Sequence, residues 1–221
     1  MASVNLVYVV TSFIVVIISL TFHEYAHAAS ANALGDPTAK RMGRMSLNPI
    51  VHIDPVGTIL LPIMLSVMGA GVFGWAKPVP VNLGNLRNTK RDQAIVSIAG
   101  PAANLCLATI ASVLIRILVV MGTPTEGTMF ILFILVNLVR INIFLMAFNL
   151  LPIMPLDGSG VIQFFMSPKT LFSYQQLSQK LVLVFLLIIL MTNWIYTFYL
   201  RPVSNVFFFI LQPLAGIQLV Q

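Results

Sequence analysis

The sequence predicts an all-α polytopic membrane protein with about five to six transmembrane helices, a re-entrant segment and a small β-strand element. Of the 221 residues, 58% are hydrophobic and 8% are charged, whereas about a quarter of the residues in a soluble domain are charged. The mean hydropathy of +0.97 is equally unusual for a soluble protein. Several apolar runs also approach the roughly 20 residues that a helix needs to cross a bilayer.

The predicted transmembrane helices are the apolar runs 5–33, 94–121, 128–150, 181–199 and 203–220. A further apolar segment, 56–73, lies between two groups of basic residues, which are Lys40, Arg41 and Arg44 on one side and Lys77, Arg87, Lys90 and Arg91 on the other. Basic loops stay on the cytoplasmic side, so a complete crossing would place one group on the wrong face. We therefore favour a re-entrant dip for 56–73, with a complete crossing as the alternative.

Two stretches between these runs are predicted to be extended, residues 39–47 and 72–83. Pro78 and Pro80 exclude a central strand from the second stretch but allow an edge strand, because a proline has no N–H to give to a neighbouring strand. A plain connecting loop is the alternative interpretation. This pair of stretches is the predicted small β element, which we expect to lie beside the active site.

We expect a single integral-membrane domain over residues 1–221, with a core at about 5–165 and additional transmembrane helices at 174–220. The net charge of +6 is attributed to basic cytoplasmic loops. Binding of nucleic acid is not expected, since no basic tract is interleaved with aromatic residues. The single cysteine, Cys106, lies in an apolar run and is expected to be a small core residue.

The residues His23, Glu24 and His27 form a polar cluster near the end of the first apolar run. Residues four apart lie on one face of a helix, so the two imidazoles are presented together in the H-E-x-x-H arrangement that binds zinc. The glutamate then remains available to take a proton from the attacking water. A charge inside a bilayer costs about 2.5–3.5 kcal/mol, which zinc ligation can offset. The alternative is a set of interfacial residues solvated by headgroups and water.

A catalytic zinc usually has three protein ligands, and Asp157 is the best candidate for the third. It follows Pro152 and Pro155, which interrupt a membrane segment in FNLLPIMPLDGSG (148–160). The other acids have simpler explanations as loop, ion-paired or turn residues: Glu126, Asp92, Asp36 and Asp54. The alternative for Asp157 is that it only caps a short helix, which is worth about 1 kcal/mol.

Three motifs occur in a specific order: HEYAH (23–27), AGPAAN (99–104) and NLLPIMPLDG (149–158). Together they resemble the signature elements of the site-2 protease family of intramembrane zinc metalloproteases, peptidase family M50. The resemblance covers about residues 10–165, and the chain looks like a compact form without a PDZ or CBS domain. The stretch 43–58 also looks like one from a compact bacterial or archaeal subgroup.

The resemblance implies that His23, His27 and Asp157 bind one Zn²⁺ ion per chain. It implies that Glu24 is the general base of the reaction.

Three further residues are weaker candidates for binding substrate or ordering the site. The resemblance suggests this role for Asn104 and Asn149, and the alternative is hydrogen bonding between helices. His52 stands in a loop near the membrane surface, where it is expected to approach the metal, tune water access or be a structural residue. Arg140, inside the 128–150 run, has no partner that the sequence identifies.

The implied function is hydrolysis of peptide bonds in or near transmembrane segments of single-pass membrane proteins, which is regulated intramembrane proteolysis. A substrate helix must unwind first, because its carbonyl groups are already hydrogen-bonded, and 72–83 is a hypothetical edge for strand addition. We expect a multi-pass protein of a prokaryotic inner membrane, with its active site nearer the cytoplasm. The rival interpretation is a transporter or proton relay that uses Glu24 and Asp157, although no inverted repeat is visible. No oligomeric state is predicted.

Overall fold

The computed structural model describes residues 6–60, 64, 74–122, 125–191 and 196–217. Its elements in chain order are α1 (Leu6–Ala33), α2 (Thr38–Arg41), η1 (Pro49–His52), η2 (Pro55–Leu60), η3 (Leu83–Asn85), α4 (Thr89–Val120), α5 (Glu126–Asn149), α6 (Asp157–Gln163), α7 (Pro168–Met191), η4 (Tyr196–Leu200) and α8 (Arg201–Ala215). The short elements η1 and η3 are 3-10 turns, whereas η2 and η4 are π-helical turns. The described part of the chain is therefore helical, with irregular connections.

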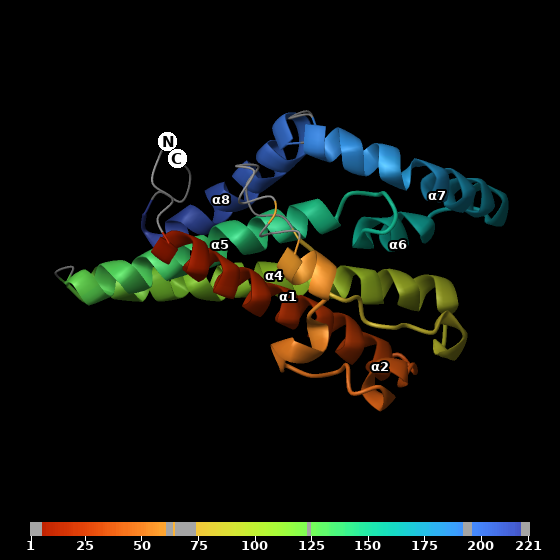
Figure 1. The fold of residues 1–221 in the computed structure, drawn as a ribbon, viewed down its shortest axis with the longest axis horizontal. Helices are drawn as coiled ribbons and strands as arrows, with labels where there is room; N and C mark the ends of the chain where they lie inside the picture. Colours follow the sequence, from red (N-terminus) through yellow and green to blue (C-terminus); the bar gives the residue numbers. More distant parts are fainter. Residues whose placement is uncertain (1–5, 61–63, 65–73, 123–124, 192–195, 218–221) are drawn as a thin grey trace.

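The helices α1, α4 and α5 form an elongated central bundle (Figure 1). Within the described residues, three helices are long and apolar enough to cross a membrane: Val9–Ala33, Thr89–Val120 and Glu126–Asn149. Figure 1 shows α2 and α7 on opposite sides of this bundle. The short helix α6 packs on α4.

Small side chains allow α4 to lie close to α5 and α8. The buried core between these helices contains Ala108, Ala111, Ile115, Val139, Ile143, Met146, Leu211 and Ala215. Close packing of this kind holds membrane helices together by van der Waals contact, because lipid offers no strong hydrophobic driving force between them. The core begins one helical turn after Asn104, so it fixes the part of α4 that faces the polar residues of α1.

One face of α1 is apolar and exposed. Its residues Val7, Val10, Ile14, Ile18 and Phe22 recur every three or four positions and are between 38% and 55% exposed. A soluble monomer rarely leaves such a stripe uncovered, whereas a membrane helix directs it toward lipid. The polar residues of α1 described below lie on its buried side.

The predicted helices 5–33, 94–121 and 128–150 are confirmed as α1, α4 and α5. The helix α4 begins earlier than predicted, at Thr89. Its start is set by Asn88, whose side chain accepts a 3.1 Å hydrogen bond from the N–H of Arg91 and so caps the helix.

The two C-terminal runs differ from the prediction in their limits. The helix α7 begins at Pro168 rather than near 181, and residues 192–195 lie outside the described residues. The helix α8 has 15 residues, fewer than the roughly 20 that a crossing needs. The predicted crossing at 203–220 is therefore not confirmed, and its last residues, 218–221, lie outside the described part.

The predicted β-strand element is wrong for the residues that the structure describes. Residues 39–41 belong to α2, and residues 42–47 form turns and bends. Residues 74–82 have no regular secondary structure, so the alternative of a connecting loop applies to them. The prolines Pro78 and Pro80 remove two of the N–H groups that a ladder would use.

Two other predictions concern residues near or inside the membrane. The prediction that 56–73 re-enters the membrane falls mostly on residues 61–63 and 65–73, which lie outside the described residues.

The prediction that Cys106 is a core residue is wrong, because its side chain is exposed on α4. Hydropathy cannot separate lipid-facing from core-facing positions, since both favour apolar residues.

Candidate metal centre

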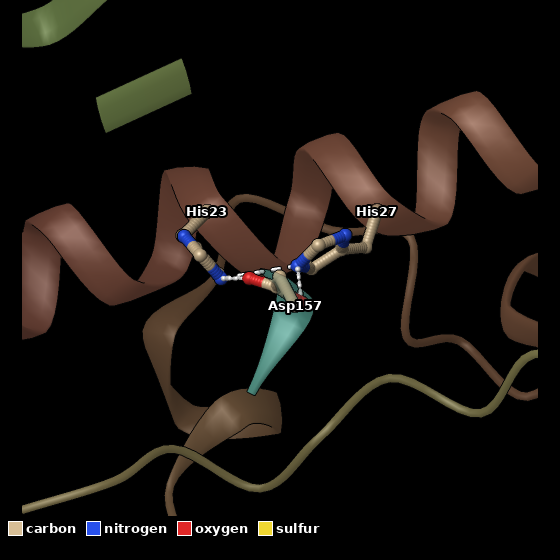
Figure 2. Close-up of side chains that lie close together, drawn as sticks. All are labelled: His23, His27 and Asp157. Carbon is tan, nitrogen blue, oxygen red and sulfur yellow. Dashed lines mark hydrogen bonds and ion pairs between the residues drawn. The ribbon is translucent and has the colours of Figure 1, made fainter. Parts of the chain in front are cut away.

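The side chains of His23 and His27 lie one helical turn apart on the buried side of α1. The two residues are 4% and 8% exposed, and their ring centroids are 4.6 Å apart. Figure 2 shows both imidazoles directed toward Asp157, which comes from α6. The helix therefore presents both rings to one point, as the four-residue spacing predicts.

Asp157 reaches this point because the chain turns back at the end of α5. Residues 150–156 form a series of turns, and α6 starts directly at Asp157. A Cβ atom on Gly158 would lie 2.2 Å from the carbonyl oxygen of Leu150, so only glycine fits this turn. The cap position of α6 is Leu156, and Asp157 faces the histidines instead of capping the helix. The capping alternative for Asp157 is therefore wrong.

The side chains of His23, His27 and Asp157 form a triangle of possible metal ligands. The two carboxylate oxygens of Asp157 lie 3.1 Å from His23 Nε2 and 3.2 Å from His27 Nε2. The two Nε2 atoms are 3.0 Å apart. A tetrahedral zinc ion with bonds of about 2.0–2.1 Å separates its ligand atoms by about 3.3 Å, so the triangle has the right size.

The donor atoms of this triangle also have the chemistry that a cation needs. His27 Nδ1 is 2.7 Å from the carbonyl oxygen of Val96, which can only accept, so Nδ1 carries the proton and Nε2 presents a lone pair. Asp157 Oδ2 is buried and has no hydrogen-bond partner in the described part of the chain. Lone pairs and a carboxylate that face one another are stabilised by a cation between them, so the site fits zinc.

The backbone of α4 lies directly against both imidazoles at Gly100. A Cβ atom there would be 2.4 Å from His27 Nε2 and 2.6 Å from His23 Nε2. One turn further along α4, Asn104 Oδ1 lies 2.7 Å from His23 Nδ1. The AGPAAN motif therefore supplies both a close approach to the ligands and a partner for one of them.

Glu24 is buried beside the ligands and has a main-chain partner. Its Oε2 atom accepts a 2.8 Å hydrogen bond from the backbone N–H of Val79. Val79 belongs to the irregular stretch 74–82, which we call the 74–82 segment. Glu24 Oε1 has no hydrogen-bond partner among the described residues, so one carboxylate oxygen is held and the other can bind a water molecule.

The 74–82 segment is anchored to the rest of the protein by its backbone. The N–H of Trp75 donates to the carbonyl of Gly57 (3.1 Å), and the N–H of Lys77 donates to that of His52 (2.9 Å). The buried side chain of Arg44 donates through Nη2 to the carbonyl of Lys77 at 2.6 Å. These contacts hold Val79 at Glu24.

The other two weaker candidates, His52 and Asn149, have local partners. His52 is buried, and its Nε2 lies 2.8 Å from the carbonyl oxygen of Ser46, while its Nδ1 has no partner among the described residues. His52 is not part of the ligand group. The side-chain amide of Asn149 donates to the carbonyl of Leu145 in its own helix at 2.9 Å. Asn104 therefore makes a hydrogen bond to a candidate metal ligand, whereas the hydrogen bonds of His52 and Asn149 go to backbone carbonyl groups.

The other acidic residues are engaged elsewhere, which explains why they do not join the triangle. Asp92 pairs with Arg91 at 2.8 Å, and Asp54 accepts hydrogen bonds from the N–H groups of Val56 and Gly57. Asp36 is buried and accepts a hydrogen bond from the N–H of Asn82, and Glu126 is exposed in the first turn of α5.

Comparison with known proteins places the chain in a family. The chain is 42% identical to the Bacillus subtilis protein named "Putative zinc metalloprotease YwhC" over 162 residues, which cover 70% of this chain and 68% of the relative. The chain belongs to the zinc metalloprotease family of YwhC. No family model matches the metalloprotease, and no solved structure matches it.

Two mycobacterial relatives carry a similar name. The metalloprotease is 32% identical to "Putative zinc metalloprotease Rip2" of Mycolicibacterium smegmatis over 155 residues, which cover 70% of this chain and 56% of that protein. It is 29% identical to the protein of the same name in Mycobacterium tuberculosis over 196 residues, which cover 87% and 68%. These names support a zinc cofactor and favour a peptidase over the transporter interpretation.

Several residues that surround the site lie outside the three sequence motifs. Arg44 and the N–H of Val79 carry no signal that links them to Glu24 in the sequence. Asn142 and Ser19 are also close to the site through Asn104. For Asn142 a signal was available, because an amide in the middle of an apolar helix is costly unless it has a partner.

Proposed function

We propose that this metalloprotease is an intramembrane zinc protease of the site-2 protease type, peptidase family M50. Its substrates would be single-pass membrane proteins that are cut in or near their transmembrane segments. The observation that carries the proposal is the position of the ligands: His23 and His27 lie within Val9–Ala33, a helix long and apolar enough to cross a membrane. A peptidase site on such a helix is accessible to substrates that share the bilayer.

In this proposal His23, His27 and Asp157 hold the zinc ion. When bound, zinc makes water nucleophilic at neutral pH and polarises a peptide carbonyl. Glu24 takes the proton from the attacking water on its free carboxylate oxygen and delivers it to the leaving amine. The hydrogen bond from Val79 fixes the second carboxylate oxygen and so orients this base.

Water and substrate would approach from the side of Asp157. Its side chain is 18% exposed, compared with 5% for His23, so the imidazole side of the site is the more closed one. A substrate helix would have to unwind at this point, because its carbonyl groups are bonded within the helix.

Strand addition of the substrate onto residues 72–83 remains a hypothesis with a structural constraint. The N–H groups of Trp75, Lys77 and Val79 already have partners in the protein. Pro78 and Pro80 have no N–H to offer. An added peptide would therefore bond to carbonyl groups of the 74–82 segment or displace its present partners.

We further propose a multi-pass protein of a prokaryotic inner membrane, with the site nearer the cytoplasm. His23 and His27 lie in the second half of α1, and the basic residues Lys40, Arg41 and Arg44 follow soon after that helix ends at Ala33. Basic residues next to a membrane helix are retained on the cytoplasmic side.

The test is to measure zinc content and cleavage for wild-type protein, Glu24→Gln and Asp157→Ala in liposomes that contain a single-pass substrate. Wild type is expected to bind one zinc ion and cut, Glu24→Gln to keep zinc without cutting, and Asp157→Ala to lose much of both. The exposed Glu126→Gln is the matched control and should behave as wild type. Normal cleavage by Glu24→Gln would exclude the mechanism, and cleavage of soluble peptides alone would exclude the intramembrane substrate.

A further inference from the structure

We propose that Asn142 and Ser19 are positioning residues for the metal ligand His23. Acting through Asn104, they hold its imidazole so that Nδ1 carries the proton and Nε2 is left for the metal. This inference rests on the proposed zinc site, and it assigns a role to two residues that touch neither metal nor substrate.

A continuous chain of buried hydrogen bonds links these residues. His23 Nδ1 lies 2.7 Å from Asn104 Oδ1, and Asn104 Nδ2 donates to Asn142 Oδ1 at 2.8 Å. Asn142 Nδ2 in turn donates to Ser19 Oγ at 2.8 Å. Ser19, Asn104 and Asn142 are all 0% exposed. The chain runs from α1 to α4, then to α5, and returns to α1 one turn before His23.

The donor and acceptor roles in this series of hydrogen bonds are fixed at the end that is distant from His23, at Asn142 and Ser19. A side-chain amide can be turned over, so its orientation must be inferred from partners that have one role only. Asn142 Nδ2 lies 2.8 Å from the carbonyl oxygen of Leu138, and Ser19 Oγ lies 2.7 Å from that of Val15. A carbonyl oxygen can only accept. Asn142 therefore turns its nitrogen toward Leu138 and its oxygen toward Asn104.

The orientation of Asn142 then determines that of Asn104 and His23. Because Asn142 offers an oxygen, Asn104 must place its nitrogen there and its own oxygen at His23. The imidazole nitrogen facing that oxygen must be the donor, so His23 carries its proton on Nδ1. If Asn104 were turned over, two oxygens would face each other at Asn142, which is costly in a buried site. His23 would then accept at Nδ1 and carry its proton on Nε2, where no lone pair would remain for a metal.

The two imidazoles are thus oriented in different ways. His27 donates directly to the carbonyl of Val96, which has only one possible role. His23 donates to Asn104, whose amide could serve in either orientation and is itself oriented by Asn142 at 2.8 Å and by the backbone carbonyl of Ser19 at 3.5 Å. The contacts with Asn142 and Ser19 thus support the ligand, as outer partners of metal-bound histidines do in other zinc sites.

The experiment compares zinc affinity, measured by competition with a chelator in detergent micelles, for wild type, Asn142→Leu and Ser19→Ala. Asn137→Leu is the matched control, because Asn137 is also buried on α5 but does not belong to this series of hydrogen bonds. Its Nδ2 has no partner in the described residues. We expect Asn142→Leu to weaken zinc binding about 10–100-fold. Ser19→Ala should weaken it less, because Asn142 keeps the carbonyl of Leu138. Asn137→Leu should bind zinc as wild type does.

A second readout separates positioning from folding. The melting temperature is measured with and without zinc for each variant. A positioning role predicts that Asn142→Leu reduces the increase in melting temperature that zinc produces, since this increase depends on affinity. If Asn142→Leu or Ser19→Ala lowers both melting temperatures equally and zinc affinity is unchanged, the residues are structural only and the inference is wrong. An equal loss of affinity in Asn137→Leu would also overturn it. A wild-type protein that binds no zinc would instead refute the proposed function itself.

Discussion

The backbone N–H of Val79 donates a 2.8 Å hydrogen bond to the side chain of Glu24, which is distant in sequence. Replacing Val79 by proline removes this donor and leaves the metal ligands in place. We predict that Val79→Pro keeps its zinc content and cuts a membrane substrate about tenfold more slowly, because a hydrogen bond to a charged group is worth about 1.5–3 kcal/mol. Val79→Ala keeps the N–H and should cut at a rate close to that of wild type. Equal rates for the two variants would show that the contact does not orient the base.

The guanidinium of Arg44 holds the 74–82 segment by bonds to the carbonyl groups of Lys77 and Pro78, at 2.6 and 3.4 Å. Arg44→Met keeps much of the unbranched stem of the side chain but removes the guanidinium. We predict that it slows substrate cleavage about tenfold and makes the segment easier for an added protease to cut, because hydrogen bonds from a charged donor are worth about 1.5–3 kcal/mol. Arg44→Lys should restore little of this activity, since an ammonium group lacks the planar array of donors. The exposed Arg41→Met is the control for charge, and a similar loss of cleavage there would attribute the effect to charge alone.

The polar residues of α1 and the turn at Asp157 could be predicted from the sequence, because both signals are local. A pair of histidines four residues apart and an acid after two prolines stand out in an apolar chain. The contact of Val79 with Glu24 could not be predicted in this way. This contact joins two segments that are 55 residues apart in the sequence. It depends on how those segments pack together and not on the spacing of residues along one helix.

In a membrane helix, hydropathy does not distinguish buried positions from lipid-facing ones. Cys106 and Ala108 are two residues apart on α4 in equally apolar surroundings, yet the first is exposed and the second is fully buried. In water the polar face of a helix would mark its outside, but in lipid both faces are apolar. The predicted strand at 72–83 is wrong over its described residues for another reason. The N–H groups of Trp75, Lys77 and Val79 bond to η2, η1 and the side chain of Glu24 instead of to a neighbouring strand.

Asp36 connects the end of α1 to the end of the 74–82 segment and to η3. Its carboxylate accepts hydrogen bonds from the backbone N–H of Asn82 at 2.7 Å and from the side chain of Asn85 at 2.9 Å. Burial raises the pKa of Asp36, but hydrogen bonds from Asn85, Thr38 and Asn82 outweigh it and hold the pKa below the ordinary value of 3.8.

A lowered pKa means that the folded state favours the charged carboxylate. The resulting stability is fully present above the unfolded-state pKa and is lost as the pH falls through the lower pKa of the folded state. We predict that Asp36→Asn lowers the melting temperature at neutral pH and that the difference from wild type shrinks below about pH 4. The exposed Glu126→Gln should show a small difference at every pH. A difference for Asp36→Asn that does not change with pH would mean that shape, and not charge, is responsible.

The close approach of α4 to the two imidazoles leads to a prediction about the metal. Gly100→Ala would place a Cβ atom 2.4 Å from His27 Nε2, which is closer than real Cβ contacts allow. Because the backbone of α4 is held by its packing on α1 and α5, the imidazoles must give way, and their lone pairs then no longer meet at one point. We predict that zinc affinity falls by more than about 100-fold, which exceeds the loss expected for an outer partner of a ligand.

The control for this prediction is Gly127→Ala in the first turn of α5. A Cβ atom there would meet nothing closer than 4.0 Å, and alanine favours a helix over glycine by about 1 kcal/mol, so this variant should bind zinc normally and melt no lower than wild type. Zinc affinity is measured by chelator competition and folding by helical circular dichroism in detergent. A folded Gly100→Ala variant with normal zinc affinity would mean that His23 and His27 do not hold the metal through the nitrogens that face Gly100. The same result would also mean that zinc is not bound next to Glu24. This one substitution therefore tests the ligand geometry on which the proposed chemistry depends.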